Sequence, residues 1–163
     1  MFILEGLDGC FKTTVAGLVS KKLGIEVVKG STFEHAQCTN EELFEKFKEL
    51  AKLENVVLDR FIYSNQVYAT LYQDFAILTK EQRKDIESSI HGKAKLFYLH
   101  ADDKVVQDRI TTRGDEYVDV SMVPRISKEY TRAISEAGIP VISYDTNEWT
   151  SEEIAEDIVR LVR

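Results

Sequence analysis

The sequence has few cysteines, few histidines and no long apolar run, and each shortage excludes a class of protein. Two cysteines among 163 residues, Cys10 and Cys38, do not make a disulfide framework, so we expect reduced thiols rather than a small secreted scaffold. The three histidines show no metal-ligand spacing, which argues against a structural zinc site. Without a bilayer-length apolar run or a secretory signal, we expect a cytoplasmic protein with no membrane partner.

Basic charge is also scarce. The formal net charge is −7 at pH 7, with 21 Lys and Arg against 28 Asp and Glu, which disfavours a broad surface for a nucleic-acid polymer. A small anionic ligand still fits this balance, because a local group of cations can hold it. The chain shows no linker, repeat or low-complexity tract, so we expect residues 1–163 to form a single domain.

Short apolar runs alternate with helical patterns along the whole chain. The runs that we expect to form β-strands are residues 2–5, 25–28, 56–58, 95–100 and 141–144. Amphipathic or capped segments separate each run from the next, which is the order of a parallel sheet with helices on both faces. The sequence therefore predicts an α/β fold with three layers, α/β/α, around a five-stranded parallel sheet.

The segment that organises the chain is FILEGLDGCFKTT, residues 2–14. A strand pattern runs into a glycine turn, and Lys12 and Thr13 follow at the start of a helical pattern. Glycines let backbone N–H groups turn inward around a polyanion, and a lysine can reach its terminal phosphates. The Thr13 hydroxyl is a hard oxygen ligand of the kind that Mg²⁺ prefers. The residues predicted to bind ATP here are Gly6, Leu7, Asp8, Gly9, Cys10, Phe11, Lys12, Thr13 and Thr14.

One position departs from the phosphate-loop pattern G-x-x-x-x-G-K-[ST], because Phe11 stands where the second glycine is expected. From the residue type alone, a phenylalanine is tolerated there only if its φ is negative and its ring points away from the nucleotide. The alternative is an ordinary glycine-rich turn that binds no phosphate. Cys10 is expected to be a spacer, with a reactive thiol near a helix N-terminus as the alternative.

A second polar group follows the expected third strand, in DRFIYSNQVY, residues 59–68. Asp59 and Arg60 are expected at the same sheet edge as the phosphate loop, since the carboxyl ends of parallel strands share one edge. A carboxylate there can assist Mg²⁺, and an arginine can grip a phosphate through two hydrogen bonds. The alternative is a structural ion pair at a helix start. These side chains suit phosphoryl transfer, because that reaction depends on positioning the substrates and neutralising their charge more than on covalent chemistry.

EGLDGCFKTT together with DRFIYSNQVY resembles the thymidylate kinase family of P-loop nucleoside monophosphate kinases. That family has E-G-x-D-G-x-G-K-[ST]-T at its N-terminus and D-R-Y-x-x-S-x-x-x-Y after its third strand. The resemblance implies a P-loop kinase fold in which Asp8 lies near the acceptor's 3′-hydroxyl and Arg60 holds the acceptor phosphate. It also implies that Ser64 and Asn65 face the acceptor base and that Tyr68 disfavours a 2′-hydroxyl.

The polar stretch around residues 109–120 resembles the arginine-rich lid of the same family. Arg109 and Arg113 match its arginines, and closure over ATP would exclude water, the competing acceptor. The alternative is a solvated helix end. The loop after the fifth expected strand resembles the segment that borders adenine, which implies a contact from Asn147 to ATP.

The chain is short for this family between the second expected strand and Asp59, where relatives carry a ring that stacks on the base and an arginine that contacts it. Phe33 is the expected stacking ring, with Phe44 and Phe47 as alternatives that also suit core positions. Lys29 could replace the arginine, or it could be a solvated lysine. The base and sugar of the acceptor therefore stay open.

The favoured function is Mg²⁺-dependent transfer of the γ-phosphoryl group of ATP to a deoxynucleoside monophosphate. The favoured reaction is the conversion of dTMP to dTDP. The residues that the resemblance implies as catalytic are Lys12, Asp59, Arg60, Arg109 and Arg113, with Thr13 and Asp59 on the metal. One alternative is a kinase for a deoxynucleoside or another small alcohol, in which Asp59 or Asp8 acts as base. Another is a catalytically degenerate module that binds a nucleotide or a partner, in which Phe11 blocks productive phosphate binding. A homodimer through aromatic-rich helices is a further expectation.

Overall fold

The computed structural model describes residues 1–31, 37–115 and 118–162. At its centre lies one parallel sheet with the strand order β2-β3-β1-β4-β5. The strands are β1 (Phe2–Glu5), β2 (Glu26–Lys29), β3 (Val56–Asp59), β4 (Lys95–His100) and β5 (Val141–Asp145). The predicted five-stranded parallel sheet is confirmed, with strand ends that differ from the expected ones by a residue at β2, β3 and β5.

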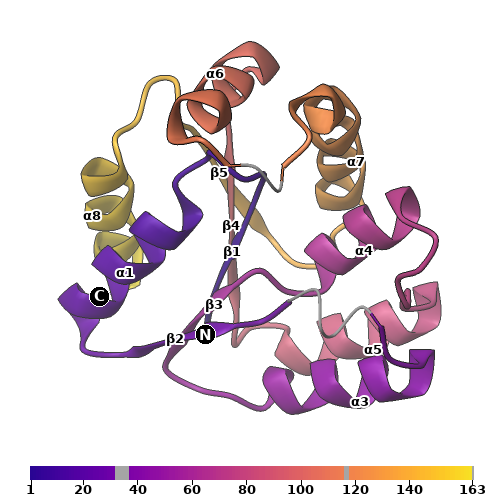
Figure 1. The fold of residues 1–163 in the computed structure, drawn as a ribbon. Helices are drawn as coiled ribbons and strands as arrows, with labels where there is room; N and C mark the ends of the chain where they lie inside the picture. The colour runs from indigo at the N-terminus through magenta and orange to yellow at the C-terminus, as the bar shows by residue number, and fades with distance from the viewer. Residues whose placement is uncertain (32–36, 116–117, 163) are drawn as a thin grey trace.

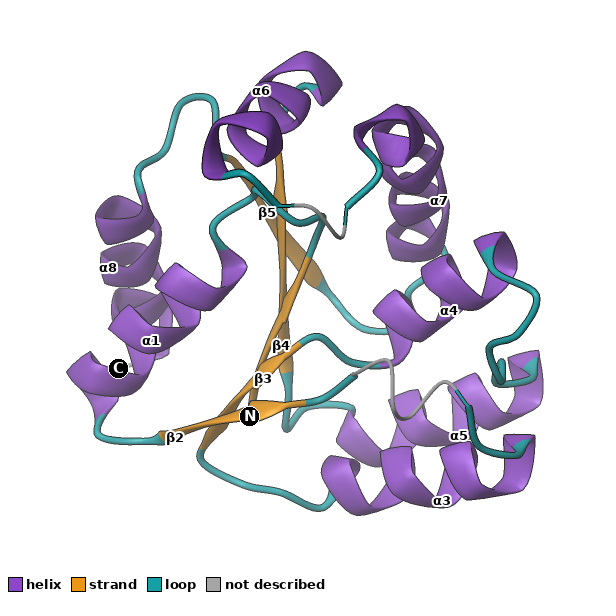
Figure 2. Cartoon of the chain, in the orientation of Figure 1, coloured by secondary structure: helices purple, strands orange, loops and turns teal. Residues whose placement is uncertain are grey.

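Helices cover both faces of the sheet (Figure 1 and Figure 2). They are α1 (Lys12–Leu23), α3 (Asn40–Ala51), α4 (Ile62–Leu71), α5 (Lys80–Ile90), α6 (Asp103–Arg113), α7 (Val123–Ser135) and α8 (Ser151–Val162), with a short 3-10 turn η1 (Val120–Met122) before α7. In both views α1 and α8 lie side by side on one side of the sheet, and α3, α4, α5 and α7 lie on the other. Within the described ranges, no helix has the length and apolar character needed to cross a bilayer.

The three inner strands β1, β3 and β4 are largely buried and apolar on both faces, because each face packs against helices. In β1, Ile3 is fully buried with Leu43 of α3 and Ile86 of α5. Its neighbour Leu4 points to the other face and packs with Val15 of α1. Continuous apolar runs are what a parallel sheet covered on both sides requires. The sheet is therefore held rigidly between the two helix layers, with its loops at the edges.

The helix starts differ in how they are capped. Thr39 and Thr79 begin α3 and α5 with capping boxes that their own sequences provide. The helix α4 has no such cap at Phe61. Instead, the buried Glu5 carboxyl group at the end of β1 accepts the backbone N–H groups of Phe61 at 2.7 Å and Ser64 at 3.1 Å. Glu5 thus fixes the start of α4 against β1, at the edge where the phosphate loop begins.

Candidate active site

The loop between β1 and α1 has the shape of a phosphate cradle. Gly6 has φ 141°, and a Cβ atom there would lie 2.1 Å from the Leu99 carbonyl oxygen, so only glycine fits. The buried Lys12 folds back and donates from Nζ to the Leu7 carbonyl at 2.8 Å. Burial, and then the charge of Arg60, lower the pKa of Lys12 to about 8. Lys12 is therefore mainly cationic at neutral pH, beside a helix N-terminus that attracts anions.

The expected negative φ of Phe11 is wrong. Phe11 has φ 64° and ψ 12°, the left-handed region that glycine enters freely and that costs another residue about 1–2 kcal/mol. Its ring centroid lies 4.3 Å from the guanidinium carbon of Arg109 on α6. Arg109 also donates to the Gly9 carbonyl at 3.1 Å. The ring that replaces the expected glycine therefore packs against a cation at the site.

Cys10 in the same loop is fully buried in the main apolar cluster. Burial raises the pKa of its thiol. A buried thiol of raised pKa is a poor nucleophile, because the thiolate is the reactive form. The packing favours the spacer role for Cys10 over the reactive alternative.

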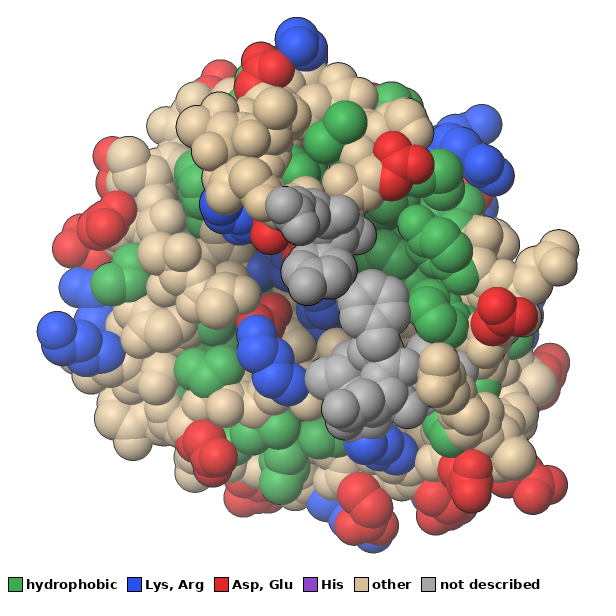
Figure 3. Space-filling model, in the orientation of Figure 1, with side chains coloured by type: hydrophobic (Ala, Val, Ile, Leu, Met, Phe, Trp, Pro, Cys, Tyr) green, Lys and Arg blue, Asp and Glu red, His purple; other side chains and the backbone are tan. Residues whose placement is uncertain are grey.

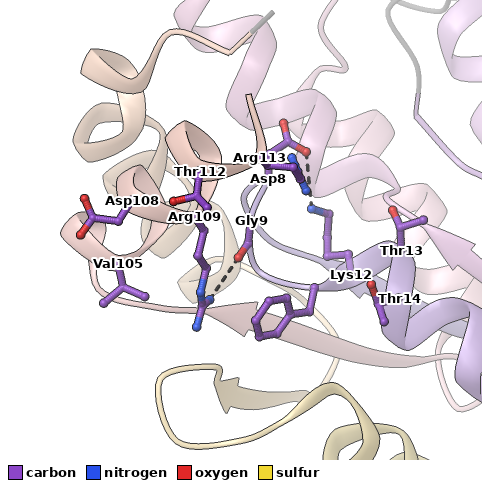
Figure 4. A pocket seen from close by; sticks show the side chains of 11 residues that line it. Asp8, Gly9, Lys12, Thr13, Thr14, Val105, Asp108, Arg109, Thr112 and Arg113 are labelled. Carbon is purple, nitrogen blue, oxygen red and sulfur yellow. Dashed lines mark hydrogen bonds and ion pairs between the residues drawn. The ribbon is translucent and has the colours of Figure 1, made fainter. Parts of the chain in front are cut away.

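A cleft of about 700 Å³ opens between the phosphate loop and α6, a volume typical of sites for small ligands (Figure 4). Its lining residues are Asp8, Gly9, Phe11, Lys12, Thr13 and Thr14 from the loop and α1, and Val105, Asp108, Arg109, Thr112 and Arg113 from α6. Figure 4 shows Arg109 reaching the Gly9 backbone and Lys12 reaching Asp8. Figure 3 shows a hollow near the middle of this face, where blue Lys and Arg side chains meet red acidic ones.

Thr13 and Asp59 form an oxygen pair beside this cleft. The Thr13 hydroxyl lies 3.0 Å from Asp59 Oδ2, and the Lys29 ammonium contacts the same oxygen. Burial alone would raise the pKa of Asp59, but the hydrogen bond from Lys29 and the charge of Lys12 lower it below its ordinary value. Asp59 is therefore ionised at neutral pH.

A hydroxyl next to an ionised carboxylate fits Mg²⁺, which takes one or two protein oxygens and completes its shell with water and substrate phosphates. No group of three or more His, Cys, Asp or Glu side chains that could hold a metal occurs in the part of the chain that the structure describes. A magnesium ion shared with a bound phosphate therefore suits these residues better than an all-protein metal centre. Lys29 was predicted to contact the acceptor, and in this structure its ammonium group contacts the Asp59 carboxylate.

Arg60 follows β3 and holds a second set of polar contacts at the same edge. Its Nη2 lies 2.7 Å from Asp8 Oδ1, and its Nη1 donates to the hydroxyls of Tyr130 at 2.9 Å and Tyr68 at 3.4 Å. The same Asp8 oxygen lies 4.0 Å from Lys12 Nζ. Burial would raise the pKa of Asp8, but Arg60 and Lys12 lower it below its ordinary value. One ionised carboxylate thus stands between two cations.

Tyr130 of α7 is a site residue that the sequence did not reveal. It is fully buried, and its hydroxyl lies 3.0 Å from Ser64 Oγ, which in turn bonds to Glu5. A chain of hydrogen bonds therefore runs from Arg60 through Tyr130 and Ser64 to Glu5. The helical pattern predicts that Tyr130 is a core residue. Its polar partners, Arg60 and Ser64, are far away in the sequence, so no local signal indicates a further role.

Asn65 makes both of its amide contacts within the chain. Its Nδ2 donates to the Ala76 carbonyl at 2.8 Å, and its Oδ1 accepts the Leu78 N–H at 3.3 Å. These bonds fix the segment after α4. A contact from Ser64 or Asn65 to an acceptor base stays a prediction, although each side chain is already engaged.

The remaining predicted site residues are Phe33, Arg113, Asn147 and those of the expected lid. Phe33 and residues 116–117 of the expected lid lie outside the described residues. Arg113 ends α6, is more than half exposed, and donates from Nε to Asp115 at 3.0 Å. The Asn147 backbone N–H donates to Asp145 at 2.9 Å, and Asn147 is not among the described residues that line the cleft.

No family model matches this chain. It is 49% identical over 162 residues to the SPbeta prophage-derived protein YorR of Bacillus subtilis (strain 168), covering 99% of this chain and 98% of that protein. A crystal structure of the Bacillus subtilis YorR protein in complex with phosphorylated GDP has 49% identity and a TM-score of 0.95, covering 99% of this chain and 94% of that one.

More distant structures share the fold. Deoxyadenosine kinase from M. mycoides with bound dCTP has a TM-score of 0.64 at 19% identity, covering 99% of both chains. Thymidylate kinase from Candida albicans has a TM-score of 0.57 at 15% identity, covering 99% of this chain and 89% of that one. At such identities the likeness concerns the fold alone. The chain belongs to the family of the prophage-derived protein YorR, and its fold is that of the P-loop kinases.

Proposed function

We propose that this protein transfers the γ-phosphoryl group of ATP to a deoxynucleoside monophosphate, with dTMP as the first acceptor to test. The observation that carries the proposal is the Asp8 carboxylate between two cations, Lys12 in the phosphate loop and Arg60 after β3. A kinase that transfers a phosphoryl group between two phosphorylated substrates needs a cation at the phosphate of each substrate. The two phosphates must also lie close enough for direct transfer. The spacing of Lys12 and Arg60 about one carboxylate supports such a pair of phosphate sites.

The roles follow from position. Lys12 and the loop amides hold the donor phosphates. Thr13 and Asp59 would hold Mg²⁺, which would supply positive charge against the phosphates. Arg60 holds the acceptor phosphate, and Arg109 in the cleft neutralises charge that develops on the donor. An oxygen of the acceptor phosphate attacks the γ-phosphorus, and ADP leaves. The acceptor phosphate is ionised at neutral pH, so the reaction needs no general base.

The alternative acceptor, a nucleoside hydroxyl, would need a base. Asp8 and Asp59 are the candidate bases, and cations beside each hold its pKa below the ordinary value. A carboxylate of lowered pKa is a weaker base, which disfavours proton abstraction from a hydroxyl. The electrostatics of the site therefore support a phosphate acceptor over a nucleoside.

The crystal structure of the related YorR protein with phosphorylated GDP supports nucleotide binding by this chain. It also extends the substrates worth testing, because a guanine nucleotide can enter as donor or as acceptor. We place GTP beside ATP, and dGMP beside dTMP, for that reason. We further propose that residues 1–163 act as one domain, with residues 109–120 as the lid.

The test is release of nucleoside diphosphate from Mg-ATP or Mg-GTP in the presence of nucleosides and nucleoside monophosphates. Lys12→Ala is the inactive control, and Lys46→Ala is the matched one, because Lys46 is an exposed lysine of α3 that does not line the cleft. Turnover that depends on a deoxynucleoside monophosphate and vanishes in Lys12→Ala supports the proposal. Turnover on nucleosides alone, or binding of ATP without turnover on any acceptor, would overturn it.

A further inference from the structure

The aromatic ring in the phosphate loop contacts the arginine that α6 brings into the cleft. We propose that Phe11 is a positioning residue, whose ring holds the Arg109 guanidinium at the donor site before a nucleotide binds. This inference rests on the proposed function, because it assigns the cleft to the donor. It goes further by giving a role to the residue that departs from the phosphate-loop pattern.

Arg109 is held from several sides. Its Nη1 donates to the Gly9 carbonyl at 3.1 Å and to the Thr146 hydroxyl at 2.8 Å, and its Nη2 donates to the Thr146 carbonyl at 2.7 Å. Thr146 is itself anchored, since its N–H donates to the His100 carbonyl at 2.7 Å. These contacts engage the guanidinium nitrogens, and the guanidinium carbon lies over the Phe11 ring, 4.3 Å from the ring centroid.

Ordering an arginine costs side-chain entropy, and a ring that stacks on the guanidinium repays part of that cost before the ligand arrives. The donor then meets a cation that is already in place, which is how preorganisation raises affinity. A glycine at position 11 would give the loop its turn but no surface for Arg109. The ring therefore adds to the loop something that the ordinary pattern lacks.

The backbone of Phe11 supplies an independent argument. Its φ of 64° is unfavourable for phenylalanine and free for glycine. Strained residues of this kind persist where the surrounding structure holds them and are concentrated at functional sites. The two effects of Phe11→Gly then have opposite signs, since the change relieves the backbone and removes the ring. If Phe11 had only a structural role, Phe11→Gly would not weaken donor binding while leaving the thermal stability of the protein unimpaired.

Calorimetric titration of the whole chain with Mg-ATP and Mg-GTP, without acceptor, measures donor affinity directly. We expect Phe11→Gly and Phe11→Leu to bind the donor about five- to tenfold more weakly, which is the loss expected for one cation–π contact. Phe11→Tyr keeps an aromatic face and should restore the affinity. The melting temperature of Phe11→Gly should stay close to that of the unchanged protein, because the relieved backbone offsets the lost packing of the ring against the main apolar cluster.

A double-mutant cycle shows whether Phe11 acts through Arg109. In an Arg109→Ala background, Phe11→Gly should change the donor dissociation constant by less than about twofold, because the partner of the ring is gone. The backbone control is Asn55→Gly, which relieves another left-handed residue, φ 52°, at the opposite end of β3. It should leave donor affinity unchanged.

Equal or tighter donor binding by Phe11→Gly, or additive effects in the cycle, would overturn the inference. Absence of any binding of ATP and GTP to the unchanged protein would overturn it as well. Since the titration needs neither acceptor nor turnover, failure of every acceptor counts against the proposed function only, and the titration still decides the role of Phe11.

Discussion

Arg60 and Asp8 form an ion pair across the carboxyl edge of the sheet, with Arg60 Nη2 at 2.7 Å from Asp8 Oδ1. Asp8 belongs to the phosphate loop and Arg60 to the turn after β3, so the pair joins the two halves of the site. The left-handed backbone of Arg60, with φ 71°, and the bond from its N–H to the Leu4 carbonyl at 2.9 Å fix its direction. An acceptor phosphate would share Arg60 with Asp8.

Arg60→Lys should lower kcat/KM for the acceptor about a hundredfold, because lysine is a point charge that cannot make a two-pronged contact with phosphate. Donor affinity, measured by calorimetry without acceptor, should stay within about twofold, since Arg60 is assigned to the acceptor alone. Arg125→Lys, at an exposed position of α7, is the matched control. An acceptor kcat/KM for Arg60→Lys equal to that of the control would contradict the role of Arg60.

Tyr130→Phe removes the hydroxyl that accepts from Arg60 at 2.9 Å and leaves the buried ring in place. We expect KM for the acceptor to rise about five- to tenfold with little change in kcat, because a hydrogen bond to a charged group contributes about 1.5–3 kcal/mol and Arg60 keeps its other partners. Tyr144→Phe is the control, since its hydroxyl bonds to Asp157 of α8 at 2.8 Å. Equal steady-state constants for the two variants would argue that Tyr130 only packs.

Asp59→Asn should raise the Mg²⁺ concentration for half-maximal activity about tenfold or more, because a neutral amide oxygen is a weaker Mg²⁺ ligand than an ionised carboxylate oxygen. An amide nitrogen in place of Asp59 Oδ2 also could not accept the hydrogen bond that the Thr13 hydroxyl donates there. The measurement is initial rate against free Mg²⁺ at saturating nucleotide, with a chelator as the zero point. Asp85→Asn, an exposed aspartate of α5, is the control. An unchanged Mg²⁺ requirement would remove Asp59 from the metal site.

Glu5→Gln should destabilise the fold most at low pH. Burial raises the pKa of Glu5 above 4.5, so the native state favours the protonated form. For a carboxyl of raised pKa, its contribution to stability is full below the unfolded pKa and is lost as pH rises through the folded one. The free-energy difference between the unchanged protein and Glu5→Gln should therefore shrink as the pH is raised from about 4 toward neutral.

Denaturant unfolding of both proteins across that range measures this difference. The exposed Glu26→Gln of β2 serves as the control, and its difference from the unchanged protein should vary much less with pH. If the difference for Glu5→Gln grew as the pH rose, the charged form would be the stabilising one, and the reasoning on Glu5 would be wrong.

The parallel sheet and the phosphate loop were predictable because their signals are local. Continuous apolar runs mark buried strands, and glycines followed by Lys12 mark a loop around an anion. The same pattern held information about Phe11 that the sequence interpretation missed. A glycine in a motif can mark lack of space or a positive φ, and the structure gives the second reason at position 11.

The hydrogen-bonded chain behind Arg60 could not be predicted in this way. Tyr130 is 70 residues from Arg60, and Glu5 is 59 residues from Ser64. Periodicity reports which face of a helix is buried, and it says nothing of which polar group lies opposite a buried tyrosine. Such contacts depend on the packing of α4 and α7 over the sheet, which only the folded structure provides.

The measurement that tests phosphoryl transfer most directly is phosphorus NMR of the purified protein with Mg-ATP and dTMP, with Lys12→Ala in parallel. If the protein is a nucleoside monophosphate kinase, the β-phosphate signal of dTDP should grow as the γ-phosphate signal of ATP declines, and neither should change in Lys12→Ala. The same spectra with dGMP in place of dTMP would identify the other acceptor. Growth of inorganic phosphate alone, or no change with any nucleoside monophosphate, would contradict the proposed transfer.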